Sequence, residues 1–276
     1  MTSIPLHLDD LDDENPWDIG VDLFNVFNDL IQPSASQLSV HEAAEKINML
    51  HPDNEQEDGL YREAAISFTL EMDDMHVKLA SQILYQRPEM DKLVDLFFDS
   101  KAAFVQRERI GTKLTGGVVE YNARAMIAQN DQPQDCVKYR NLSSFLARLA
   151  KAGFEDSNML YAFIALHEAM EFEFEASNVF HVVESEYLVP IAAEWIIKAG
   201  ELISLNGGTV GGYARKRGQL WKGEPTLCLK RWQFWTSRFE LFASCEALTE
   251  ETRNAAKEAA EKMRCIKELK YGAEDV

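Results

Sequence analysis

The sequence predicts an all-α fold: a single multi-helix globular domain of roughly eight to ten helices, preceded by an acidic N-terminal segment. Three observations lead to this prediction. Apolar residues recur at intervals of three and four along nearly every segment. Stretches with the strict alternation of a half-buried strand are almost absent. The 276 residues, 46% of them hydrophobic, are enough to bury a sizeable core.

The first helices are predicted from their spacing and their caps. Residues 18–32 place apolar side chains three positions apart, and Pro33 ends the run. The hydroxyl of Ser39 can accept a hydrogen bond from the amide three residues on, while Glu42 reaches back to the amide of residue 39. This pair is a capping box, so a second helix is expected to begin near residue 39.

Later helices are predicted at 60–86, 89–109, 141–153, 156–177, 186–204, 228–243 and 249–270. The first of them is expected to break near Asp73 and Asp74, which together with His76 are interpreted as a helix break or an exposed face. Gly153 suits a left-handed cap at the end of its helix. Residues 110–138, rich in Gly and Pro, are the least regular part.

Charge is unevenly distributed along the chain. Residues 1–60 hold fourteen of the Asp and Glu residues but a single basic one, Lys46, within a formal net charge of −18. We therefore expect an acidic N-terminal segment with one docking helix at 1–37 and a helical domain at 38–272. A surface this negative repels phosphate backbones and anionic lipid headgroups, so neither nucleic acid nor a membrane is an expected partner.

The cysteines and the hydropathy pattern indicate a cellular compartment. Cys136, Cys228, Cys245 and Cys265 form no CxxC pair and are interpreted as buried free thiols. The N-terminal residues show no signal-peptide pattern, and no apolar run is long enough to span a bilayer. The expected location is the cytoplasm or the nucleus, with no secretion and no membrane span.

The aromatic stretch at 228–242 is predicted to be the buried face of a helix. One continuous stripe at helical spacing is formed by Trp232, Trp235, Phe239 and Phe242. Aromatic side chains bury large areas, which is typical of a helix that faces a core. Arg231 and Arg238 share a flank of this helix, where they can pair with carboxylates or stack on the indoles. The alternative is a half-open aromatic groove that receives a partner or ligand.

The segment HEAMEFEFE at 167–175 almost matches the zinc-protease pattern H-E-x-x-H. The match fails because Glu171 replaces the second histidine. His167, Glu168 and Glu171 offer fewer nitrogen or sulfur donors than zinc usually takes. The favoured interpretation is a solvated acidic helix face, and we expect neither a metal nor a cofactor.

Other motif matches are weak. Asp9, Asp10 and Asp13 fit the magnesium-binding pattern D-D-x-x-D of terpene cyclases, but they stand in an acidic tail with no second motif downstream. The glycines at 207–212 have neither the Lys-Ser/Thr of a P-loop nor dinucleotide-binding spacing, and are interpreted as part of a connector. The basic run at 215–217 is too short to indicate nucleic-acid binding.

Several segments resemble a fungal family catalogued as domain of unknown function 3632. The resemblance rests on "GQLWKGEPTLCLKRWQFWTSRFELFA", "LTEETRNAAKEAAEKM", "RPEMDKLVDLFFDSK", "NLSSFLARLAKAGFEDSNMLYAFIALHEAMEFE" and "IAAEWIIKAGELI". It implies a fungal, soluble, all-helical protein, and it supplies no activity and no catalytic residues. One departure is visible, because His167 stands where the family pattern L-R-x-A-L-E has arginine.

These observations favour a non-enzymatic protein-interaction module whose partner is another protein. The hypothesis rests mainly on the absence of a coherent catalytic set. The candidate partner or ligand surface comprises Trp232, Trp235, Arg238, Arg231, Glu168, Glu171 and His167. The alternative is an enzyme or carrier for a small apolar molecule, held in a cavity between aromatic helices. The sequence leaves the oligomeric state open.

Overall fold

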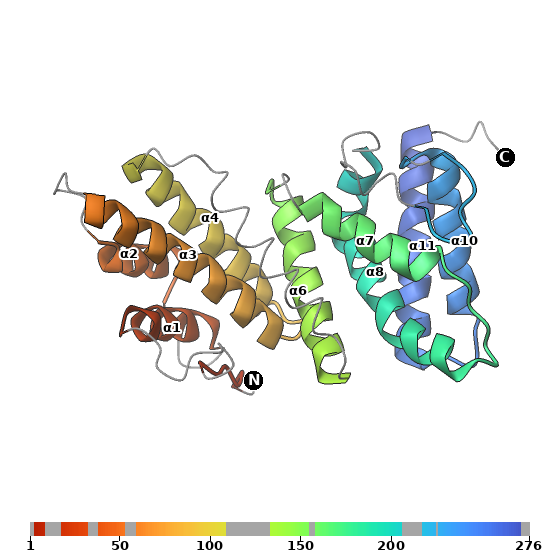
Figure 1. Cartoon of the computed structure of the whole chain (residues 1–276), viewed down its shortest axis with the longest axis horizontal. Coiled ribbons are helices and arrows are strands. Elements are labelled where there is room, and N and C mark those ends of the chain that lie inside the picture. The colour runs from red at the N-terminus through yellow and green to blue at the C-terminus, as the bar shows by residue number, and fades with distance from the viewer. Residues whose placement is uncertain are drawn as a thin grey trace. The chain divides into compact units, whose positions relative to one another are not determined.

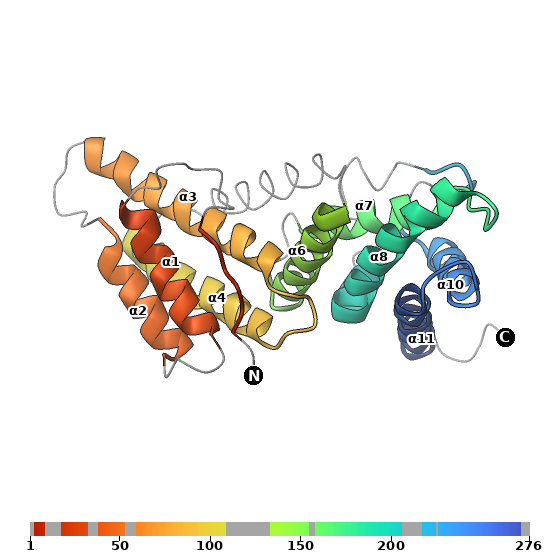
Figure 2. The ribbon, with the colours of Figure 1, turned by 90° about the horizontal axis from the view of Figure 1, so that it is seen from below.

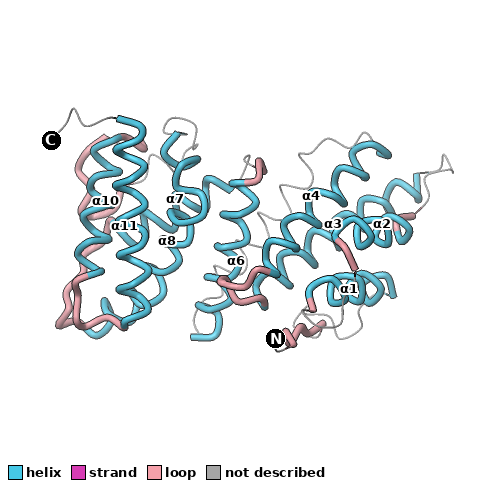
Figure 3. Tube along the Cα trace, turned by 180° about the vertical axis from the view of Figure 1, so that it is seen from behind, coloured by secondary structure: helices cyan, strands magenta, loops and turns pink. Residues whose placement is uncertain are grey.

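The computed structural model describes residues 3–8, 18–32, 38–52, 59–108, 133–154, 158–205, 217–224 and 226–271. These ranges contain nine helices and no strand, which confirms the all-α fold class (Figures 1 and 3). Contacts between Cα atoms divide the chain into two compact units, Met1–Phe145 and Leu146–Val276. The boundary expected near residue 37 stays a prediction.

The first unit is built around four helices: α1 (Asp18–Ile31), α2 (Val40–Leu50), α3 (Gly59–Gln82) and α4 (Glu89–Glu108). Helix α1 packs against α2, α3 and α4, and α2 packs against α4 (Figure 2). The imidazole of His76 lies in the core of this unit, edge-on to Phe27 at 4.6 Å and to Phe97 at 5.2 Å between ring centroids. Its Nδ1 forms a hydrogen bond of 2.8 Å with the carbonyl of Met72, one turn earlier.

Helix α3 runs without a break through Asp73 and Asp74, so the predicted interruption is wrong. The alternative interpretation as an exposed face also fails for Asp73 and His76, which are both fully buried. Asp74 pairs with Lys78 at 2.7 Å across one helical turn. The sequence pattern was misleading because polar side chains in a helix interior usually mark its solvent side, whereas here they face a core.

Two cap predictions are confirmed. The amide of Glu42 donates to Ser39 Oγ at 3.2 Å, and the amide of Ser39 donates to the Glu42 carboxylate at 2.8 Å. Gly153, which follows α6 (Pro133–Lys151), has a φ of +109°. The amide of Phe154 then donates to the carbonyl of Leu149, as expected where a left-handed residue ends a helix.

The second unit contains the end of α6 and four further helices: α7 (Asn158–Met170), α8 (Val179–Leu205), α10 (Leu229–Ala243) and α11 (Glu250–Tyr271). Helix α8 packs against α7 and α11, and α11 lies beside α10 (Figures 1 and 2). Gly200 of α8 permits close contact with α11, because a Cβ atom there would lie 3.0 Å from the side chain of Ile266.

Helix α8 contains Pro190, which lacks the amide that would bond to the carbonyl of Glu186. The hydroxyl of Thr252 in α11 donates to the Glu186 carboxylate at 2.5 Å and lies 3.4 Å from that carbonyl. The Glu186 carboxylate in turn accepts from the amide of Thr249, the residue before α11, at 2.6 Å. The Glu186 carboxylate of α8 therefore holds the start of α11 through Thr249 and Thr252.

The structure corrects several boundaries and one burial prediction. Helix α6 begins at residue 133, not 141; α7 ends at 170, not 177; and α8 begins at 179, not 186. The four cysteines are free, but none is fully buried, and Cys265 is exposed. The predictions at 1–2, 9–17, 109–132 and 206–216, including the acidic motif and the glycine-rich connector, lie outside the described residues.

Candidate functional site

The candidate site centres on Glu171, the first residue after α7. Its amide still bonds to the carbonyl of His167 at 3.1 Å, which completes the last turn of the helix. Its side chain has no exposed surface. A carboxylate in this position is expected to be heavily hydrogen-bonded, because an isolated charge in a protein interior is very unfavourable.

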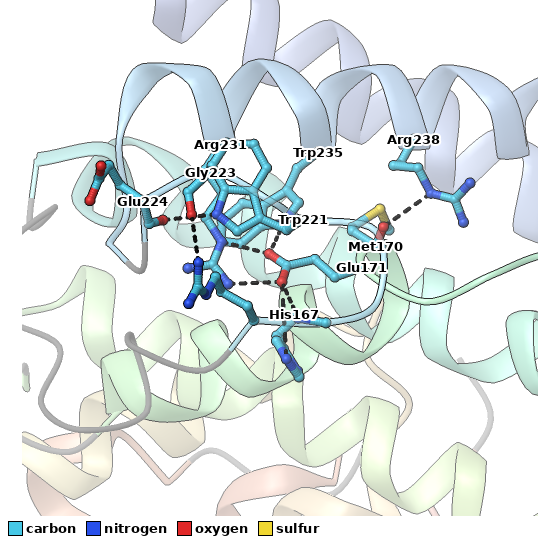
Figure 4. Close-up of polar contacts among 11 residues, drawn as sticks. His167, Met170, Glu171, Trp221, Gly223, Glu224, Arg231, Trp235 and Arg238 are labelled. Carbon is cyan, nitrogen blue, oxygen red and sulfur yellow. Dashed lines mark hydrogen bonds and ion pairs between the residues drawn. The ribbon is translucent and has the colours of Figure 1, made fainter.

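Four donors meet the Glu171 carboxylate (Figure 4). Arg231 Nε donates to Oε1 at 2.6 Å and Arg231 Nη2 donates to Oε2 at 2.9 Å, which gives a two-pronged ion pair. The indole Nε1 of Trp235 donates to Oε1 at 2.9 Å, and the amide of Gly218 donates to Oε2 at 2.9 Å. Each carboxylate oxygen therefore accepts two hydrogen bonds.

The backbone of Glu171 is held as closely as its side chain. Its carbonyl accepts from the amide of Leu220 at 2.9 Å. A Cβ atom on Gly218 would lie 2.4 Å from the Glu171 Cβ and 2.5 Å from its carbonyl oxygen. Only glycine fits at this distance, so residue 218 joins the segment 217–224 to the end of α7 by backbone contact.

Aromatic rings surround the buried guanidinium of Arg231. Its Cζ lies 4.6 Å from the ring centroid of Phe163, 5.3 Å from Trp235 and 5.8 Å from Trp221. The ring faces attract the cation without competing for its N–H groups. The Trp221 indole donates to the carbonyl of Glu224 at 2.8 Å, which holds this ring in place. We call Glu171, Gly218, Trp221, Arg231 and Trp235 the Glu171 cluster.

Arg238 lies two turns further along α10 and also binds the end of α7. Its Nε donates to the carbonyl of Met170 and its Nη2 to the carbonyl of Phe172, both at 3.0 Å. Its guanidinium lies over the ring of Phe242 at 4.9 Å. Burial lowers the pKa of the Arg238 guanidinium. A cation at the C-terminus of a helix is favourable because the unpaired carbonyls there carry partial negative charge.

The structure confirms the predicted buried stripe, because its four members are all in the core: Trp232, Trp235, Phe239 and Phe242. The prediction of a solvated acidic helix face is wrong for Glu171, which lies in the interior and is paired with Arg231. His167 and Glu168 are half-buried, and His167 Nε2 lies 4.0 Å from Glu171 Oε2. Of the predicted surface residues, Trp232, Trp235, Arg231 and Glu171 are buried, so none of these four side chains presents a surface.

Sequence reasoning missed Gly218 and Trp221 as members of the cluster. Both stand in a stretch that is interpreted as a connector, and Gly218 is 47 positions away from Glu171. No local pattern predicts a contact over such a separation. The only signal was the occurrence of both residues in the segments that carry the family resemblance.

The described part of the chain contains neither a candidate metal site nor a candidate membrane-spanning helix. No three His, Cys, Asp or Glu side chains within it cluster closely enough to hold a metal ion. No helix within it is long and apolar enough to cross a bilayer.

The fold and the Glu171 cluster define an all-α protein in which a buried ion pair joins three segments. The chain belongs to a family described as "Protein of unknown function (DUF3632)", whose model matches residues 74–239. All five residues of the Glu171 cluster lie within the matched range. No curated protein matches the chain, and no solved structure matches it.

Proposed function

We propose that the chain is a non-enzymatic protein-interaction module and that the Glu171 cluster is the structural centre of its second unit. The observation that carries this proposal is the full engagement of Glu171. Its two oxygens accept four hydrogen bonds from the chain itself, and its charge is balanced by Arg231. A general base or nucleophile needs a free lone pair within reach of a substrate. This carboxylate is used to hold segments together.

The same reasoning applies to the polar groups expected to orient a small apolar molecule. The expected contacts are Glu168, Glu171 and Arg238; of these, Glu171 binds Arg231 and Arg238 binds two backbone carbonyls. The aromatic stripe of α10 is buried against the protein's own helices. These contacts favour the interaction module over the enzyme or carrier.

The proposal includes a location in the cytoplasm or nucleus of a fungal cell. The four free cysteines support a reducing compartment. The resemblance to a fungal family supports the fungal origin.

Native mass spectrometry of the protein purified from its own source tests the proposal. We expect a second polypeptide bound in a fixed ratio, with the mass of the chain recovered under denaturing conditions. A small molecule bound in a one-to-one ratio would contradict the proposal and favour the enzyme or carrier. The mass of that molecule would then identify the chemistry to assay.

A further inference from the structure

The first turn of α8 exposes a group of large apolar side chains. Val179 is 72% exposed, Phe180 85% and Val183 53%. Val183 stands four positions after Val179 and three after Phe180, so it neighbours both on the helix surface and the three side chains form one patch. We call it the α8 apolar face. Single exposed apolar residues are ordinary, but a contiguous group that includes a nearly fully exposed Phe calls for a physical reason.

This turn is held firmly, so its exposure does not come from a loose helix end. The side chain of Asn178 accepts from the amide of Phe180 at 3.0 Å, as an N-cap does. The amide of Asn178 donates to the carbonyl of Glu175 at 2.9 Å. The amide of Glu175 donates to His181 Nδ1 at 3.1 Å. The chain before α8 is therefore folded back on its first turn.

The surroundings of the α8 apolar face are acidic. Residues 152–197 contain nine Asp and Glu residues and neither Lys nor Arg. Glu173 and Glu175 in the segment before α8 are exposed, and so is Glu184, one helical turn after Phe180. The guanidinium of Arg238 in α10 is engaged by the carbonyls of Met170 and Phe172. The rim of this surface thus carries net negative charge.

We propose that the α8 apolar face, with its acidic rim, docks a basic amphipathic helix of a partner protein. Apolar side chains of such a helix would cover Val179, Phe180 and Val183, while its Lys and Arg residues would meet Glu173, Glu175 and Glu184. Charge complementarity selects this occupant. A second copy of the chain would bring one acidic rim against another, and anionic lipid is repelled in the same way. This proposal rests on the interaction role proposed above and names its partner class.

Fluorescence anisotropy with labelled model peptides on the full chain tests the inference. The probe is an amphipathic helical peptide of Leu and Lys, and the control is a peptide of the same pattern with Glu in place of Lys. We expect the basic peptide to bind and the acidic one not to bind. Phe180→Ser should weaken binding of the basic peptide about tenfold or more, as loss of a central aromatic contact does.

The chain offers a matched control in Leu269, which is 86% exposed near the end of α11. Leu269→Ser removes an equally exposed apolar side chain and should leave peptide affinity unchanged. Replacing Glu173, Glu175 and Glu184 by Gln should lower the affinity and flatten its salt dependence. Circular dichroism melting should show that all of these variants stay folded.

Three results would overturn the inference. The first is equal binding by the acidic and basic peptides, and the second is equal weakening by Phe180→Ser and Leu269→Ser. The third is a dimer in sedimentation that Phe180→Ser dissociates, which would make a second copy the occupant. If one of these is found while native mass spectrometry still shows a bound polypeptide, only the docking surface is wrong. A stoichiometric small molecule in that spectrum would instead contradict the proposed function.

Discussion

A fully buried ion pair such as that of Glu171 and Arg231 has two opposing effects. Moving both charges out of water is unfavourable, and their attraction repays this only when the geometry is good and the remaining donors and acceptors are satisfied. Here the pair is two-pronged, with distances of 2.6 and 2.9 Å, and Trp235 and Gly218 bond to the same carboxylate. The pair therefore specifies which segments meet. Removing one partner alone destabilises the protein far more than replacing both partners by apolar residues, because it leaves a buried charge without a counter-charge.

Glu171→Gln tests this role. The amide keeps the shape of the carboxylate, but it leaves the Arg231 guanidinium buried without a counter-charge. We expect the free energy of unfolding to fall by roughly 3–5 kcal/mol, measured by urea denaturation. Arg231→Met should be similarly destabilising, and the double variant should lose less than the sum of the two.

Lys262→Met is the matched control, because Lys262 pairs with Glu201 at 2.7 Å on the protein surface. Exposed ion pairs contribute little, so the stability of this variant should stay within experimental error of the parent. Equal effects of Glu171→Gln and Lys262→Met would contradict the structural role of the Glu171 cluster.

At the scale of helices, hydrophobic spacing was sufficient to predict that each described element is a helix, but it did not fix all their ends. The predicted helix at 156–177 includes the run MEFEFE at 170–175, yet this run alternates apolar and polar residues and α7 stops at Met170. Beyond Met170 the chain is held by tertiary contacts, among them the bond from Arg231, 60 positions further on, to Glu171 in the interior. Local propensity could not predict this, because the favourable interaction is tertiary. The capping box at Ser39 was predictable because all of its partners are local.

The buried stripe of α10 gives a second prediction. Trp232 is 4% exposed, and its indole donates to the carbonyl of Met263 in α11 at 3.2 Å. Trp232→Ala should lower the free energy of unfolding by roughly 3–5 kcal/mol, because it leaves a large cavity between α10 and α11. Leu241→Ala on the same helix removes a side chain that is 43% exposed and should have a much smaller effect. An unchanged melting temperature for Trp232→Ala would contradict the core assignment.

Helix α4 carries an exposed row of carboxylates at Asp91, Asp95 and Asp99, four positions apart. Partial burial, together with the charges of Asp91 and Asp99, raises the pKa of Asp95 above its usual 3.8. The folded state then binds this proton more tightly than the unfolded state, so stability falls as pH rises from 3.8 through the folded pKa. Asp95→Asn should therefore raise the melting temperature at neutral pH, with a gain that disappears below pH 3.8.

Glu42 provides a control, because its pKa is shifted in the opposite direction to that of Asp95. Its hydrogen bonds with the backbone and side chain of Ser39 lower its pKa below 4.5. Its contribution to stability is therefore present above pH 4.5 and is lost as pH falls through the folded pKa. Glu42→Gln should lower the melting temperature at neutral pH and converge with the parent in acid. Parallel pH profiles for Asp95→Asn and Glu42→Gln would contradict both assignments.

For the whole molecule, the formal net charge of −18 determines how stability responds to salt. Like charges on the surface repel one another and destabilise the compact state, and this repulsion is screened beyond about 10 Å at 0.1 M ionic strength. We expect the melting temperature to rise as sodium chloride is added. The buried Glu171–Arg231 pair is screened much less, because both side chains have no exposed surface. The stability lost in Glu171→Gln should therefore be the same at low and high salt, while the parent and the variant gain stability in parallel. A melting temperature that falls with salt would instead mean that exposed ion pairs such as Lys262–Glu201 outweigh the repulsion.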